Sequence, residues 1–183
     1  MSVQVILLSG RSGVGKTSVA NEMHEQLKIR HIPHAHIDGD NMDMIYPEED
    51  GSELFLCNLA AMFENYRRLR GCTRLIISGT AMVLEQDGIR QVIEDGIRRL
   101  SGPGEEGSAL DMKGFILTGS NAVVAERLEK REVGSALDAH LASTDRMAAV
   151  LEDKVGSWAI RVSTDGQRIK DTAGKILEQA CWI

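Results

Sequence analysis

The sequence predicts an α/β fold with a mostly parallel sheet that is covered by helices on both faces. Short apolar runs rich in β-branched residues alternate with longer stretches in which apolar residues recur at helical spacing. The first run leads directly into Gly10-Arg11-Ser12-Gly13-Val14-Gly15-Lys16-Thr17, a full match to G-x-x-x-x-G-K-[ST]. The 183 residues are 43% hydrophobic and carry no internal repeat, which suits one domain spanning 1–183.

The first two elements are the clearest. Val3-Gln4-Val5-Ile6-Leu7-Leu8 is a short apolar run that ends at Ser9-Gly10 and predicts a strand buried on both faces. From Lys16 onward the period changes, because Val19, Met23 and Leu27 recur at helical spacing. We expect this helix to end before Pro33.

The same alternation continues to the end of the chain and defines the remaining elements. We expect strands at 34–37, 73–78, 112–117 and 158–162. Helices are expected from 54 up to Gly71 and at 84–100, 121–130, 137–151 and 167–180. The segment 101–108, with three glycines and one proline, is expected to be a loop.

The glycine-rich motif between the first strand and the first helix predicts a phosphate-binding loop. Its glycines let successive N–H groups point inward at phosphate oxygens, and the helix N-terminus adds a favourable partial charge. Lys16 should reach the β and γ phosphates, and Thr17 should place its hydroxyl on Mg²⁺. ATP and magnesium are therefore the expected ligands of Gly10, Arg11, Ser12, Gly13, Val14, Gly15, Lys16, Thr17 and Ser18. We expect Arg11 and Ser12 to act through the backbone, with a solvated Arg11 side chain.

Asp38-Gly39-Asp40 follows the second strand at the sheet edge where reacting groups collect in open parallel sheets. One carboxylate can accept the proton of a substrate hydroxyl while the other helps to hold magnesium or substrate. The alternative is a turn whose aspartate caps the backbone that follows.

Residues 1–44 resemble the small P-loop kinases that phosphorylate metabolites. His36-Ile37-Asp38-Gly39-Asp40-Asn41 is especially similar to the segment after the second strand of adenylylsulfate kinases, and chloramphenicol phosphotransferases and gluconate kinases share the general layout. The resemblance implies a three-layer P-loop NTPase fold with a five-stranded parallel sheet of order 2-3-1-4-5. It also implies transfer of the γ-phosphate of ATP to a hydroxyl of a small molecule, with Asp38 as the candidate base. Whether Asp38 or Asp40 takes that role stays open.

The third strand ends with Ser78-Gly79-Thr80 and has no aspartate where many P-loop ATPases hold magnesium. This departure argues against a motor or a typical ATPase and favours a metabolite kinase. Ser78 and Thr80 are then candidate substrate or water ligands, the alternative being strand-end capping.

By the same resemblance, Arg127 and Arg131 fall where such kinases carry a lid, expected at about 127–150, whose arginines close over the phosphates. The alternative is a solvated helix face. In position, Ser163-Thr164-Asp165-Gly166 corresponds to the loop that cups the adenine.

Composition limits the partners. The net charge of −6 and the pI near 5.4 argue against duplex nucleic acid. No apolar run approaches the roughly 20 residues that cross a bilayer, so we expect a cytoplasmic protein. The small-molecule substrate is what the resemblance to metabolite kinases implies. Two other functions stay open. One is a nucleotide or polynucleotide 5′-kinase, and the other is an ATP-binding regulatory module that hydrolyses ATP slowly.

Overall fold

A computed structural model describes residues 2–47, 51–101, 109–131 and 137–183, and for residues 131 and 137–142 it describes the backbone alone. Within this part, five parallel strands form one sheet of order β2-β3-β1-β4-β5, which confirms the expected fold class and strand order. The strands are β1 Val3–Ser9, β2 Ala35–Asp38, β3 Arg74–Ser78, β4 Leu110–Thr118 and β5 Ala159–Ser163. The helices are α1 Lys16–Ile29, α2 Glu53–Arg70, α3 Gln86–Leu100, α4 Asn121–Arg131, α5 Leu137–Lys154 and α6 Ile169–Gln179.

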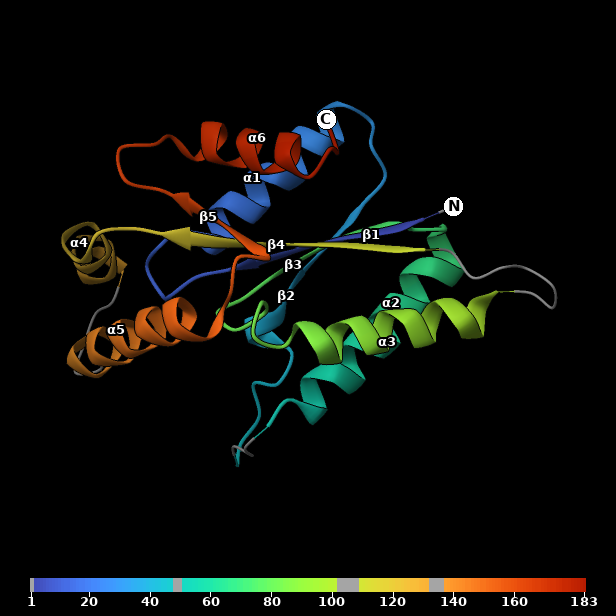
Figure 1. Cartoon of the computed structure of the whole chain (residues 1–183), viewed down its shortest axis with the longest axis horizontal. Coiled ribbons are helices and arrows are strands. Elements are labelled where there is room, and N and C mark those ends of the chain that lie inside the picture. Colours follow the sequence, from blue (N-terminus) through green and yellow to red (C-terminus); the bar gives the residue numbers. More distant parts are fainter. Residues whose placement is uncertain (1, 48–50, 102–108, 132–136) are drawn as a thin grey trace.

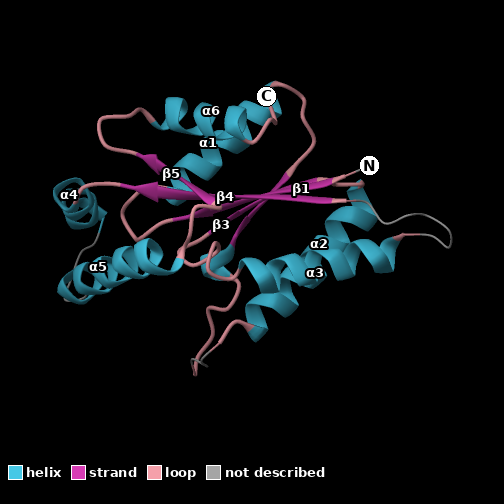
Figure 2. Ribbon diagram, in the orientation of Figure 1, coloured by secondary structure: helices cyan, strands magenta, loops and turns pink. Residues whose placement is uncertain are grey.

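The sheet divides the core into two apolar layers. Because side chains alternate along a strand, Ile6 and Leu8 of β1 face one layer while Val5 and Leu7 face the other. Helices α1 and α6 cover the first face, and α2, α3 and α5 cover the second (Figure 1). Figure 2 shows α4 beyond the carboxyl end of β4, at the end of the sheet where β1 meets the glycine loop.

The predicted elements are all present, with bounds that shift by one or two residues at most ends. The clearest prediction was β1. This strand is almost entirely buried, which explains why its sequence is a nearly continuous apolar run. The structure contains a short 3₁₀ turn, η1 Gly39–Asn41, at the place where the sequence offered a capped turn as an alternative. The loop expected at 101–108 lies, apart from Ser101, outside the described residues.

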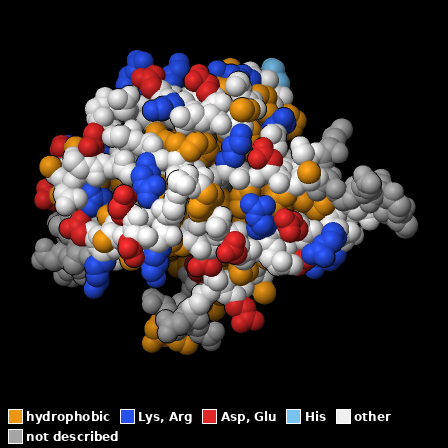
Figure 3. Space-filling view, in the orientation of Figure 1, with side chains coloured by type: hydrophobic (Ala, Val, Ile, Leu, Met, Phe, Trp, Pro, Cys, Tyr) orange, Lys and Arg blue, Asp and Glu red, His pale blue; other side chains and the backbone are white. Residues whose placement is uncertain are grey.

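The surface carries charges of both signs. On the face seen in Figure 3, acidic and basic side chains are interspersed over the helices. None of the helices in the described part of the chain is long and apolar enough to cross a membrane.

Histidines attach the edge strand β2 to its neighbours. His34 donates Nδ1–H to the carbonyl of Ile32 (2.8 Å), so its neutral ring accepts at Nε2 from Nδ1 of His24 (2.8 Å). Nε2 of His36 lies 2.9 Å from Oγ of Ser78 on β3. Burial is the main cause that lowers the pKa of both His34 and His36 below 6.5, although Asp38 raises that of His36. Both rings are therefore held neutral in the folded protein.

This burial predicts a loss of stability in mild acid. Because the folded pKa values lie below the unfolded ones, the unfolded chain binds more protons once the pH falls through 6.5. We expect the free energy of unfolding, measured in urea, to fall between about pH 7 and pH 5. His36→Gln, which cannot take up a proton, should make this decline shallower, and the exposed His31→Gln should not. A slope that His36→Gln leaves unchanged would contradict the assignment.

Candidate active site

The loop between β1 and α1 has the backbone that a phosphate cradle needs. Gly13 has φ 83° and Gly15 has φ 98°, in the left-handed region that side chains disfavour. The backbone closes on itself through Val14 N–H to the Arg11 carbonyl (3.4 Å), and Val19 N–H to the Gly15 carbonyl (2.9 Å) begins α1. The expected strand–loop–helix context of the motif is therefore present.

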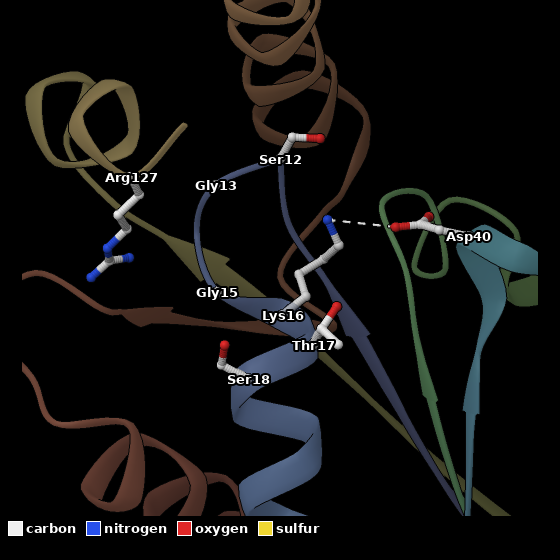
Figure 4. Close-up of a pocket in the computed structure, with 8 residues that line it drawn as sticks. All are labelled: Ser12, Gly13, Gly15, Lys16, Thr17, Ser18, Asp40 and Arg127. Atoms are coloured by element: carbon white, nitrogen blue, oxygen red, sulfur yellow. Dashed lines mark ion pairs between the residues drawn. The ribbon is translucent and has the colours of Figure 1, made fainter. Parts of the chain in front are cut away.

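Lys16 stands at the floor of a cavity of about 360 Å³ at the N-terminus of α1. The cavity is lined by Ser12, Gly13, Gly15, Lys16, Thr17, Ser18, Asp40 and Arg127. Figure 4 shows the Lys16 side chain turned toward Asp40, with Arg127 on the opposite side of the loop. The side chains of Thr17 and Ser18 are exposed at the start of the helix.

Asp40, Thr80 and Lys16 form one polar network that joins the ends of three strands. Asp40 Oδ1 accepts from the Thr80 backbone N–H (2.6 Å), and Oδ2 accepts from the Thr80 hydroxyl (3.1 Å). Lys16 Nζ donates to Thr80 Oγ1 (3.2 Å) and lies 3.7 Å from Asp40 Oδ2. The Asp40 carboxylate after β2 thus meets the ammonium group of the phosphate loop, a contact that the sequence analysis did not include.

Asp38 and Ser78 are placed differently from Asp40. Asp38 caps η1, because its Oδ1 accepts from the Asp40 backbone N–H (3.2 Å). Ser78 is buried, with 1% of its surface exposed, and its hydroxyl contacts His36. The capping turn weighed as an alternative for Asp38 is therefore present, whereas Ser78 contacts a histidine of the neighbouring strand. Neither contact fixes a role in substrate binding.

Arg127 reaches the cavity from α4 and is held by the loops on either side. Its Nη1 donates to the Val14 carbonyl (3.1 Å) and to Thr164 Oγ1 (3.2 Å). A smaller adjoining pocket of about 140 Å³ is lined by Val14, Gly15, Ser18, Val19, Arg127, Thr164, Gln167, Ile169 and Thr172. The segment after β5 thus contributes to a second compartment beside the phosphate cavity.

The expectation of a solvated Arg11 side chain is wrong. Arg11 is 5% exposed and donates to Asp145 of α5 (2.7 Å), to the Gly119 carbonyl (2.8 Å) and to Asn121 (2.7 Å). It turns away from the phosphate cavity, whose lining does not include it. No sequence signal could have found these partners, which lie more than 100 residues along the chain.

The expectations for Arg131 and for the lid concern residues that the structure describes only in part. Arg131 ends α4, but its side chain is not among the described ones, so its role stays a prediction. The expected lid at about 127–150 includes residues 132–136, which lie outside the described residues. Among the residues that the structure does describe, no group of three His, Cys, Asp or Glu side chains could hold a metal ion by itself.

The residues present fit a triphosphate with magnesium. A glycine-rich turn at the start of α1 and the Lys16 ammonium group line the cavity, and backbone amides at a helix N-terminus and an ammonium group are groups that bind phosphates. The exposed Thr17 hydroxyl beside Lys16 is an oxygen donor of the kind magnesium accepts. A larger residue at Gly13 would be tightly packed, since a Cβ there would lie 3.0 Å from side-chain carbons of Val124 and Leu128. The loop is thus held in this shape by α4.

Comparisons with known proteins agree with this geometry. The sequence profile described as adenylylsulphate kinase matches residues 2–85, which include the phosphate loop, Asp38, Asp40 and Thr80. No curated protein sequence matches the chain.

Solved structures extend the likeness over the whole fold. The tunicamycin resistance protein of Deinococcus radiodurans is 17% identical, over 97% of this chain and 95% of that one, with a TM-score of 0.61. A gluconokinase from Sinorhizobium meliloti is 19% identical over 98% and 92%, with a TM-score of 0.56. The APS kinase of Mycobacterium tuberculosis, solved with AMPPNP and APS, is 16% identical over 97% and 96%, with a TM-score of 0.56. The resemblance to small P-loop kinases is thereby confirmed, and the fold is theirs.

The glycines of the loop predict two different costs. Gly13→Ala should lower the free energy of unfolding by about 2–4 kcal/mol, because left-handed strain and overpacking against α4 add together. Gly15→Ala should cost only about 1–2 kcal/mol of backbone strain, because no atom lies within 4 Å of the place its methyl group would take. Urea unfolding of both variants checks this, and equal losses would contradict the packing argument.

Proposed function

We propose that this protein transfers the γ-phosphate of ATP to a hydroxyl group of a small molecule. The observation that carries the proposal is the contact between the phosphate-loop lysine and the carboxylate that follows β2. Lys16 Nζ lies 3.7 Å from Asp40 Oδ2. The fold shared with P-loop small-molecule kinases supports it. A phosphoryl transfer needs mainly positioning and charge neutralisation, which this arrangement can supply.

The orientation of ATP follows from the two compartments. The pocket beside Thr164 and Gln167 would take the nucleoside, and the cavity above Lys16 would take the phosphates. The γ-phosphate would then lie toward Asp40 and Thr80, where Lys16 reaches. Magnesium held by Thr17 would withdraw charge from the phosphate oxygens. Arg127, which borders both compartments, would neutralise charge from the other side.

Asp38 is the better base of the two aspartates. Both oxygens of Asp40 already accept hydrogen bonds from Thr80, and one also faces Lys16, so Asp40 is suited to hold these groups in place. Asp38 uses one oxygen to accept the Asp40 N–H, and the described residues place no hydrogen-bond donor on the other. That oxygen can accept the proton of an acceptor hydroxyl. We also propose that Arg131 and the lid at about 127–150 close over the phosphates. Ser78 is proposed as a ligand of substrate or water.

Two other functions use the same cradle. A nucleotide or polynucleotide 5′-kinase would share the transfer chemistry, but the net charge of −6 disfavours a polyanionic acceptor. An ATP-binding regulatory module with slow hydrolysis would need the cradle but no base. Localisation in the cytoplasm is also a proposal, and the fold shared with P-loop small-molecule kinases supports it.

Lys16→Ala should weaken magnesium-dependent nucleotide binding by about 10- to 100-fold, because charge-assisted hydrogen bonds to the phosphates are lost. Isothermal titration with Mg·ATP measures this. Lys28→Ala, at an exposed lysine of the same helix, is the matched control and should bind as the unaltered protein does. Equal affinity of Lys16→Ala and Lys28→Ala for Mg·ATP would contradict the proposal that Lys16 binds the phosphates.

A panel of hydroxyl-bearing metabolites, together with aminoglycoside and phenicol drugs, should contain compounds that stimulate ADP release above the background without acceptor. Phosphorylated product should appear in equal amount by mass spectrometry. Lys16→Ala should abolish the stimulation. Nucleotide binding with no stimulation by any compound would favour the regulatory module instead.

With a stimulating acceptor in hand, Asp38→Asn should lower kcat by about 10²- to 10⁴-fold, because the hydroxyl proton loses its acceptor. Its nucleotide affinity should change by less than about twofold, since Asp38 lies outside the lining of the phosphate cavity. Asp43→Asn, an exposed acid of the same loop, should keep full activity. Full turnover by Asp38→Asn with loss in Asp40→Asn would transfer the base role to Asp40.

A further inference from the structure

Arg11 lies at a position of the loop motif where any residue is permitted, yet its side chain is one of the most enclosed charges in the described structure. It is 5% exposed, and its guanidinium contacts three separate parts of the chain. Nη1 donates to Asp145 of α5, and Nη2 donates both to the Gly119 carbonyl and to Asn121 at the start of α4. All three distances fall between 2.7 and 2.8 Å.

Burying a guanidinium is costly unless its donors are satisfied, so this contact set constrains the geometry around it. The planar fork of arginine directs its donors to fixed places, which a lysine ammonium cannot reproduce. The Gly119 carbonyl and Asn121 are held by the turn between β4 and α4, and Asp145 is held by α5. Arg11 therefore fixes the distance from the phosphate loop to both helices.

The backbone of the same residue shapes the loop. The Arg11 carbonyl accepts from Val14 N–H (3.4 Å), the bond that closes the turn of the cradle. Gly10, just before it, lies against β4, since a Cβ there would be 2.7 Å from the Leu117 carbonyl oxygen. A side chain that anchors residue 11 thus also anchors the turn whose residues Ser12, Gly13 and Gly15 line the cavity.

Asp145, the partner of Arg11, lies on a helix that is itself fixed in the core. Beyond Asp145, α5 packs into the apolar core through Met147 and Leu151. The Arg11–Asp145 pair is a polar contact from this helix to the phosphate loop, whereas Arg161 ties the same helix to β5. Arg161 Nε donates to Glu152 (3.1 Å) and Nη2 to the Val155 carbonyl (2.9 Å), and none of these three residues lines the phosphate cavity.

We propose that Arg11 is a positioning residue for the nucleotide: through Asp145, Gly119 and Asn121 it sets the shape of the phosphate loop by reference to α4 and α5. It acts on the phosphates through the backbone amides and not by its own charge, because its guanidinium is turned away from the cavity. The inference rests on the proposed function only in that the loop binds a nucleotide. It adds a link between nucleotide affinity and the position of α5.

The test compares Arg11→Lys, Asp145→Asn and their double variant with the unaltered protein, using Mg·AMPPNP as the probe in isothermal titration. We expect each single variant to bind the nucleotide about tenfold more weakly, because each breaks the connection that sets the shape of the loop. Changes at residues of one hydrogen-bond network are commonly not additive. The double variant should bind no more weakly than the weaker single variant, because both changes break one connection. Asp145→Asn leaves Arg11 its carbonyl and amide acceptors, so this variant serves even where Arg11→Lys fails to fold.

Arg161→Lys is the matched control, because it weakens another arginine contact with α5 away from the loop. Thermal midpoints of all variants are measured alongside. Arg161, whose side chain is 32% exposed and whose partner Glu152 is 74% exposed, should lose less of its midpoint on change to Lys and should keep the affinity within about twofold. A loss of affinity that follows the loss of midpoint across all variants would indicate a merely structural role for Arg11.

Affinity of Arg11→Lys or Asp145→Asn within twofold of the unaltered protein, or additive effects in the double variant, would overturn the inference. A protein that binds Mg·AMPPNP but phosphorylates no acceptor would sink the proposed transfer and leave the role of Arg11 standing. The two failures are therefore told apart by separate measurements.

Discussion

The site depends on a backbone that glycine alone adopts without strain. Gly13 and Gly15 have positive φ, and α1 begins directly after the loop at Lys16. The loop is further enclosed by Val124 and Leu128 of α4 and by the Leu117 carbonyl of β4. Its shape is therefore imposed from outside as well as permitted from within, and β4 and α4 belong to the phosphate site as much as β1 does.

The parallel sheet explains why residues from distant parts of the chain meet at this loop. Parallel strands bring all their carboxyl ends to one edge, so the residues after β1, β2 and β3 become neighbours. Thr80, at the end of β3, joins Lys16 to Asp40 through one hydroxyl that both accepts and donates. In many P-loop ATPases an acid stands after this strand, whereas here the acid after β2 bonds to the threonine that follows β3.

Local pattern was enough for the parts of the fold whose determinants are local. The apolar run of β1, the helical spacing after Lys16 and the glycines between them predict strand, helix and loop, and the topology then places Asp40 at the same edge. The environment of Arg11 could not be predicted, because Asp145 is 134 residues away and nothing in either segment marks a partner. The capped turn at Asp38-Gly39-Asp40 was one of two interpretations of that segment, and its 3₁₀ form could not be predicted because three residues carry too little periodicity. The contact of Ser78 with His36 depends on the register of two strands.

The edge position of β2 has a consequence for how binding and chemistry share the molecule. This strand has four residues and one neighbour, β3, whereas β1 lies between β3 and β4. Edge segments with few contacts open at lower free energy than central strands. If β2 frayed, Asp38 and Asp40 would leave the site while the glycine loop kept its shape. Under the proposed function, opening of β2 would then abolish phosphoryl transfer at a lower free energy than is needed to release the nucleotide.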